Sequence, residues 1–336
     1  MASPMPRDAP VIKAVLPERS NKGSVMGGVQ RARSRKADHS REPCGSTRSH
    51  RGRDCYPETF HAHGPAMTAP RRRVLITGAG SGLGLALAQR YARSGARVAC
   101  VDIDAPRAEA ARAGLPGDGH LALTADVGDD ASMQALYDAV QREWNDADGT
   151  CVDVLINNAG IASAGAMVET TMDEWRKVLE IDLLGVVRGC RLFLPSMLAA
   201  KRGQILSTAS FAGLAGAPNI MSYGVAKAGV VALSEQLRAE VHAHGVRVGV
   251  ICPAFFRTNL MDSALASDAT KARVQRWMDR APDTVDSVAD KVFAHAERGV
   301  FLIIPTKREP GYWRLKRWLP GMYFRKLTQM AIARAP

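Results

Sequence analysis

The chain has few residues arranged for disulfide frameworks or metal sites. Its six cysteines include no Cys-x-x-Cys pair, and Cys100 and Cys252 lie in strand-like apolar runs. These thiols are therefore predicted to be reduced and structural, which favours a cytoplasmic location. Two histidine pairs are closely spaced, His61 with His63 and His242 with His244. They lack neighbouring carboxylate or thiolate ligands, so no metal site is expected.

Long apolar runs are also missing. No uninterrupted apolar segment reaches the roughly 20 residues of a transmembrane helix. The first 66 residues have no apolar region typical of a signal peptide.

Acidic residues are fewer than basic ones, and the net charge is +12. Residues 1–73 carry a surplus of nine positive charges and residues 305–336 a surplus of seven, which leaves −4 for residues 74–304. The basic character therefore belongs to the tails. Because no base-reading module accompanies it, no nucleic-acid partner is expected.

Composition divides the chain into three parts. Residues 1–70 are rich in Arg, Ser, Gly and Pro and are expected to form a disordered extension. Met67 is a candidate native start, in which case residues 1–66 would not belong to the native protein. The alternatives are that these residues form a genuine basic tail or a targeting peptide. The acidic residues of this segment argue against the targeting peptide. Residues 71–306 are expected to form one catalytic domain, and residues 307–336 a short basic and aromatic C-terminal extension.

Within the central part, strand-like and helix-like segments alternate. The expected strands are 74–77, 97–101, 121–124, 152–156, 204–207, 247–251 and 300–304. The expected helices are 83–94, 106–113, 132–144, 172–199, 222–244 and 285–298. Strands separated by single helices pair in parallel through right-handed crossovers. The pattern predicts an α/β fold, a Rossmann-type doubly wound parallel sheet of about seven strands with helices on both faces.

A glycine-rich turn follows the first expected strand. It reads Thr77-Gly78-Ala79-Gly80-Ser81-Gly82-Leu83-Gly84. Backbone N–H groups in such a turn bind a pyrophosphate at the start of a helix. Asp102 ends the second strand, where its carboxylate would bind the adenosine ribose and repel a 2′-phosphate. NAD(H) is therefore favoured over NADP(H), although Arg107 could meet a phosphate.

These motifs resemble those of the short-chain dehydrogenase/reductase family over residues 73–306. The matching elements are TGAGSGLG at 77–84, NNAG at 157–160, Ser210, and Tyr223 followed by Lys227. The resemblance implies cofactor contacts by a set of residues in five segments: Gly78, Ser81, Gly82, Leu83 and Gly84; Asp102; Asp126 and Val127; Asn157, Ala159 and Gly160; Pro253 and Thr258. Tyr223 and Lys227 would contact the cofactor as well.

The resemblance also implies a catalytic set. Tyr223 would act as general acid and base, with its pKa lowered by Lys227 one helical turn away. Ser210 would orient the substrate oxygen. Where the family has an Asn that completes this set, the chain has Asp182, whose carboxylate is expected to raise the pKa of Lys227.

Residues 259–282 correspond to the segment that covers the substrate in the family. Here they include Leu260, Met261, Leu265, Val274, Trp277 and Met278, and Phe255 and Phe256 precede them. An apolar alcohol or ketone is therefore expected, although ordinary core packing would give the same pattern.

Two further features concern partners. The C-terminal segment from Tyr312 to Phe324 mixes tryptophan with cations, which suits peripheral membrane contact; a packed arm or a solvated tail are the alternatives. The apolar helix 172–199 suits burial or an oligomer contact, and a homo-oligomer is expected.

The leading function is an NAD(H)-dependent oxidoreductase acting on a secondary alcohol or ketone. An NADPH-dependent ketoreductase of acyl-type substrates is one alternative. A dinucleotide-binding sensor or scaffold with low turnover is another.

Overall fold

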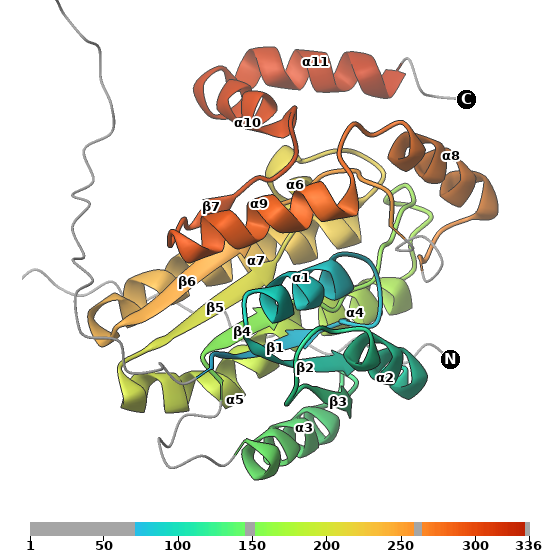
Figure 1. Ribbon diagram of the computed structural model, residues 1–336. Coiled ribbons are helices and arrows are strands. Elements are labelled where there is room, and N and C mark those ends of the chain that lie inside the picture. Colours follow the sequence, from blue (N-terminus) through green and yellow to red (C-terminus); the bar gives the residue numbers. More distant parts are fainter. Residues whose placement is uncertain (1–70, 145–151, 259–263, 333–336) are drawn as a thin grey trace, which may run out of the picture. The chain divides into compact units, whose positions relative to one another are not determined.

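The computed structural model describes residues 71–144, 152–258 and 264–332, and the account below concerns these. The predicted N-terminal extension, Met67, Leu260 and Met261 lie outside them. The described residues form a seven-stranded sheet in the order β3-β2-β1-β4-β5-β6-β7, and every pairing is parallel (Figure 1). The predicted doubly wound fold is confirmed.

The strands are short and mostly buried, as expected of a parallel sheet covered on both faces. They span β1 Arg73–Thr77, β2 Arg97–Asp102, β3 Leu121–Thr124, β4 Val154–Asn157, β5 Gly203–Thr208, β6 Val246–Ile251 and β7 Leu302–Ile303. After β3 the chain returns to pair β4 with the other side of β1. This reversal opens a crevice at the carboxyl ends of β1 and β4, where ligands bind in such sheets.

Two helical layers bury the two faces. One apolar cluster joins a face of the sheet to α1 (Gly82–Arg93), α2 (Ala105–Ala113) and α9 (Val285–Glu297). The other joins the opposite face to α3 (Asp130–Glu143), α5 (Gly185–Ala200) and α7 (Met221–Val241), which continues as the 3-10 turn His242–His244. Several helix starts carry side-chain caps, for example Asp104 before α2 and Thr284 before α9.

The helix predicted at 172–199 is continuous but not uniform. It consists of α4 (Met172–Leu179), a π-helical turn η1 (Glu180–Leu184) and α5. One helix among the described residues, Met172–Ala200, is by length and mean composition apolar enough to cross a membrane, while charged residues interrupt its apolar runs, as the sequence indicated. The apolar residues that satisfy this criterion include Val186, Phe193 and Met197, which pack against the sheet. A core helix of this kind passes the same test as a span.

Four helices were not predicted. Helix α6 (Phe211–Ala215) follows β5, and α8 (Asp268–Asp279) lies within the segment expected to cover the substrate. Helices α10 (Glu309–Trp318) and α11 (Pro320–Ile332) form the C-terminal extension; they pack on each other, and α10 packs on α6 (Figure 1). The solvated-tail interpretation of this extension is therefore wrong.

Candidate active site

One cavity of about 1250 Å³ lies at the carboxyl ends of the central strands. Its wall begins at Gly78 after β1 and continues past Ser210, Tyr223 and Lys227 to α8 and α11. Residues from both halves of the sheet therefore face one space, as the crevice between β1 and β4 requires.

The glycine turn leaves its backbone open toward this cavity. Gly78 and Gly82 have φ angles of 65° and 54°, a region that glycine adopts without steric cost. A Cβ at Gly82 would meet only Thr258, at 3.7 Å. Gly84 behaves differently, because a Cβ there would lie 2.1 Å from the Gly78 carbonyl oxygen, and it does not line the cavity. Gly84 therefore permits close packing of α1 against the turn, and its predicted pyrophosphate contact stays a prediction.

Asp102 lies at the edge of the cavity and holds the turn in place. Its Oδ2 accepts a hydrogen bond from the Gly80 N–H at 2.9 Å, and its Oδ1 accepts one from the Asp104 N–H at 3.1 Å. Arg107 also faces the cavity, with its Nε 3.5 Å from Asp104 Oδ2. Asp126 and Val127 line the same wall.

At the end of β4, one of the predicted cofactor residues does not line the cavity. Asn157 is buried on the α5 side of the sheet, where its Nδ2 lies 3.6 Å from Cys190 Sγ, and it does not line the cavity. Its side chain thus points away from the cavity, and its predicted place beside the cofactor stays a prediction. Asn158, which was not predicted, lines the cavity and donates from Nδ2 to the Thr77 carbonyl at 3.1 Å. Consecutive strand residues face opposite sides, so the adjacent Asn is the one that ties β4 to the glycine turn.

Other predicted cofactor residues line the cavity as expected. They are Ser81, Gly82, Leu83, Ala159, Gly160, Pro253 and Thr258. A dinucleotide fits this arrangement, since a glycine turn free of side chains and a carboxylate at the end of β2 lie along one cavity.

Ser210, Tyr223 and Lys227 come together from β5, α6 and α7. Ser210 precedes α6, and its Oγ accepts a hydrogen bond from the Ala212 N–H at 3.1 Å. Ser210 also hydrogen-bonds Tyr223, whose ring centroid lies 5.7 Å from Lys227 Nζ. The three side chains therefore meet at one place in the cavity wall.

The pKa of Tyr223 is set by opposing effects. Burial raises it most strongly, the Lys227 ammonium lowers it, and Asp182 raises it further. The net pKa shift in the protein without a ligand is upward. Lys227 thus acts in the predicted direction, but the expectation of a lowered pKa is wrong for this state because loss of solvent outweighs the attraction.

Asp182 and Lys227 form a buried ion pair with 3.3 Å between Oδ2 and Nζ. Asp182 Oδ1 accepts from the Ile161 N–H at 2.8 Å, and Lys227 Nζ donates to the Thr208 carbonyl at 3.1 Å. Burial alone would lower the pKa of Lys227, but attraction to Asp182 and Tyr223 outweighs it and raises the pKa, as predicted. Burial raises the pKa of Asp182, against the attraction of Lys227.

The π-helical turn η1 positions this pair. One extra residue in the turn places Asp182 on the buried side of the helix, where no part of the residue is exposed. π-turns inside α-helices often mark functional sites, and helical periodicity gives no signal for one. Asp182 does not line the cavity, so it acts on the site through its contacts with Lys227 and Ile161 and through its charge, which raises the pKa of Tyr223.

The remaining wall has an apolar part, beside polar residues such as Ser267, Thr270 and Arg273. Phe255, Phe256, Val274, Trp277 and Met278 line the cavity, and the Phe255 and Trp277 rings pack edge to face with centroids 5.8 Å apart. Leu265, predicted to belong with them, instead hydrogen-bonds through its backbone to Ala162 and Ala164. Leu327 of α11 adds a lining residue that was not predicted.

The family model described as short chain dehydrogenase matches residues 72–269. A D-threitol dehydrogenase of Mycolicibacterium smegmatis is 37% identical over 220 residues, which cover 64% of this chain and 83% of that protein.

Two solved structures share the fold. A short-chain dehydrogenase/reductase from Burkholderia phymatum in complex with NAD is 28% identical, with a TM-score of 0.67 over 74% of this chain and 93% of that one. A short-chain dehydrogenase from Sphingobium yanoikuyae in complex with NADPH is 27% identical, with a TM-score of 0.61 over 79% of this chain and 96% of that one.

Proposed function

Since the chain belongs to the short-chain dehydrogenase/reductase family and is therefore an oxidoreductase that uses NAD(P), we propose that it interconverts an apolar secondary alcohol and its ketone with NAD(H). The observation that supports this proposal is the convergence of Ser210, Tyr223 and Lys227 in the wall of the cavity that begins at the glycine turn. The cofactor, when bound, supplies hydride transfer.

The protein's own groups handle the proton. Tyr223 takes the hydroxyl proton of the alcohol during oxidation and returns it during reduction. Ser210 donates a hydrogen bond to the substrate oxygen and orients it beside the Tyr223 hydroxyl. Lys227 stabilises the phenolate electrostatically, and Asp182 is a positioning residue that holds the Lys227 ammonium in the wall.

NAD(H) is the proposed cofactor because Asp102 lies where a 2′-phosphate would meet its carboxylate. Arg107 is engaged with Asp104 at the same edge, which reduces its availability for a phosphate. The apolar wall formed by Phe255, Trp277 and Met278 supports an apolar substrate.

The acid–base assignment is tested by Tyr223→Phe, which removes the hydroxyl and keeps the ring. We expect turnover with NAD and a panel of secondary alcohols to fall by at least about 10²-fold, while NADH binding persists. Tyr137→Phe is the matched control, because Tyr137 packs edge to face on Phe193 in the core and does not line the cavity. Retained turnover in Tyr223→Phe would contradict the assignment. Cofactor binding without turnover of any alcohol by the native chain would favour the sensor alternative.

Peripheral contact of the C-terminal helices with an anionic membrane is a further part of the proposal. The exposed side chains Trp318 and Phe324 lie at the junction of α10 and α11, and Arg317 and Arg325 are close to them in sequence. The double variant Trp318→Glu, Phe324→Glu should lose cosedimentation with anionic vesicles. Equal sedimentation of variant and native protein with the vesicles would contradict the proposed membrane contact.

A cytoplasmic homo-oligomer is also proposed. Leu184 of η1 and Val225 of α7 are exposed on elements that pack together, which supports an oligomer contact. Cys100, Cys190 and Cys252 are buried free thiols, as suits a reducing compartment. Val225→Glu should dissociate the oligomer in sedimentation velocity, and an unchanged mass would contradict this contact.

A further inference from the structure

Helices α10 and α11, here called the C-terminal arm, lie outside the segment matched by the family model, which ends at residue 269. The arm follows β7 directly. Its contacts with the cavity are therefore a property of this chain beyond the matched catalytic segment.

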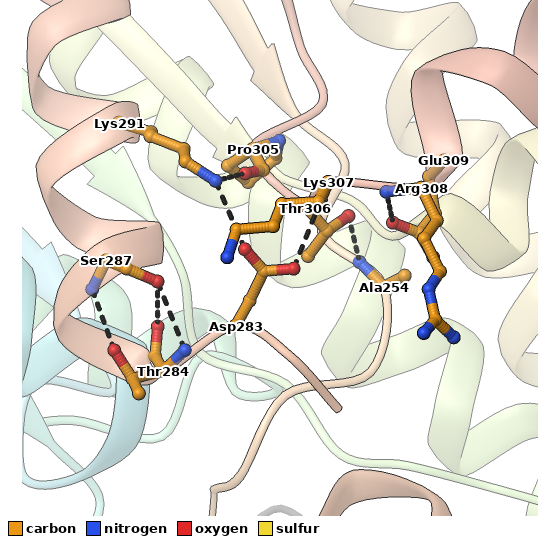
Figure 2. Close-up of polar contacts among 10 residues, drawn as sticks. All are labelled: Ala254, Asp283, Thr284, Ser287, Lys291, Pro305, Thr306, Lys307, Arg308 and Glu309. Atoms are coloured by element: carbon orange, nitrogen blue, oxygen red, sulfur yellow. Dashed lines mark hydrogen bonds and ion pairs between the residues drawn. The ribbon is translucent and has the colours of Figure 1, made fainter. Parts of the chain in front are cut away.

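The base of the arm is held by a buried carboxylate, shown in Figure 2. Asp283 has a side chain that is 2% exposed, and its Oδ1 lies 3.1 Å from Lys291 Nζ. Its Oδ2 accepts from the Lys307 N–H at 3.1 Å. Thr306 Oγ1 accepts from the Ala254 N–H at 3.4 Å, next to Pro253 in the cavity wall. The base of the arm is thus fixed both to α9 and to the segment that holds the predicted cofactor contact Pro253.

The middle of the arm satisfies the end of α6. Lys316 Nζ donates to the Leu214 carbonyl, and the Tyr323 hydroxyl donates to the Ala215 carbonyl at 3.0 Å. The last carbonyls of a helix have no partner within it, and a cation there also interacts favourably with the helix dipole. Because α6 is five residues long and begins directly after Ser210, the arm holds in place the same short helix that carries the substrate-orienting serine.

The two sides of α11 differ. Tyr323 is buried against α6, and Leu327, one helical turn further, lines the cavity. Phe324, three residues before Leu327, is 65% exposed and does not line the cavity. One side of α11 therefore forms cavity wall.

We propose that the C-terminal arm forms the distal wall of the substrate cleft, with Leu327 as the specificity-determining residue that contacts the apolar part of the substrate. Tyr323 and Lys316 are positioning residues that hold this wall against α6. The inference rests on the proposed function, in which the substrate oxygen lies at Ser210 and Tyr223 and the rest of the substrate extends toward α8 and the arm. Substrates with a longer apolar chain would therefore meet Leu327, and short ones would not.

The test measures binding without turnover. Secondary alcohols from 2-butanol to 2-decanol are titrated into the full-length enzyme saturated with NADH, and the change in NADH fluorescence gives each Kd. Alcohol and NADH are both reduced, so no reaction follows. Leu327→Trp should weaken the longest alcohol about 10-fold relative to the shortest, and Leu327→Ala should extend the range to longer chains. Phe324→Trp and Phe324→Ala are the matched controls on the outer side of the same helix and should leave the ratio unchanged.

Equal Kd ratios for the Leu327 variants and the native enzyme would overturn the proposal, as would native binding that does not depend on chain length. The same alcohols are then assayed for oxidation with NAD. Native enzyme that binds them and does not oxidise them contradicts the proposed function, whereas the Kd series still decides whether the arm selects the substrate.

Discussion

Removal of the Asp182 carboxylate should destabilise the fold by an amount that the structure sets. Its side chain is 0% exposed and that of Lys227 is 4% exposed, with 3.3 Å between the charged atoms. At an effective dielectric constant of about 20, the attraction at this distance is roughly 5 kcal/mol before desolvation is counted. Removing one partner of a buried pair leaves the other charge uncompensated, so Asp182→Ala should lower the free energy of unfolding by about 3–5 kcal/mol.

Asp182→Asn should cost less, about 1–3 kcal/mol, because an amide oxygen still accepts a hydrogen bond from the Ile161 N–H. Urea unfolding followed by tryptophan fluorescence measures both changes. Arg176→Ala is the control: it breaks an exposed pair with Asp173, and the expected cost is below about 1 kcal/mol. The double variant Asp182→Leu, Lys227→Met should recover much of the loss, since it removes both charges.

The pH dependence of the same pair has a definite sign. The folded pKa of Lys227 is raised above its ordinary 10.5, so the stabilisation is complete below pH 10.5 and is lost as the pH rises through the folded value. At alkaline pH, the difference in unfolding free energy between native protein and Asp182→Ala should therefore shrink above pH 10.5. A cost for Asp182→Ala equal to that of Arg176→Ala would refute the account of a buried, compensating pair.

Asp102→Asn should narrow the preference for NADH over NADPH by about 10-fold, because it removes the charge that a 2′-phosphate would meet; fluorescence titration with both cofactors measures this, and an unchanged ratio would contradict the role of Asp102. Burial raises the pKa values of the thiols of Cys100, Cys190 and Cys252 from 9.0 to about 12. Since the thiolate is disfavoured in the folded state, the free energy of unfolding should fall as the pH rises from 9 toward 12, by up to about 1.4 kcal/mol per thiol and pH unit. For the same reason, the native protein should react with Ellman's reagent at pH 8 much more slowly than the unfolded chain. Rapid labelling of the three thiols without loss of structure would contradict this.

Strand positions were predictable because the strands are short apolar runs, and β1, β2 and β4 end at or directly before Gly, Asp or Asn. The glycine turn, Asp102, Ser210, Tyr223 and Lys227 were predictable because their spacing along the chain is specific. The π-turn at Asp182 was not, since inserting one residue into a helix leaves the apolar periodicity almost unchanged. Asn157 ends β4 and faces α5, whereas Asn158 follows the strand and faces the glycine turn; two adjacent asparagines carry no signal that separates them.

The contribution of the C-terminal extension could not be predicted either. Its tryptophans and cations suit a membrane surface, a packed arm and a solvated tail equally well. The hydrogen bonds from Lys316 and Tyr323 to the end of α6 join segments about a hundred residues apart, and nothing local to either segment signals the pairing. Helix α6 itself is too short for periodicity to indicate.

Because of how the arm is attached, the groups proposed to transfer protons and the residue proposed to select the substrate lie on different parts of the chain. Every group proposed to move a proton lies on β5, α6 or α7, whereas Leu327 enters the cavity from a helix hairpin appended after the last strand. Exchanging that hairpin for another of similar length, with the base at Asp283 and Thr306 retained, would present a new inner surface to the cleft and leave the glycine turn and the buried ion pair untouched. The substrate range could therefore change through the hairpin alone, while the residues proposed for cofactor binding and proton transfer stay the same.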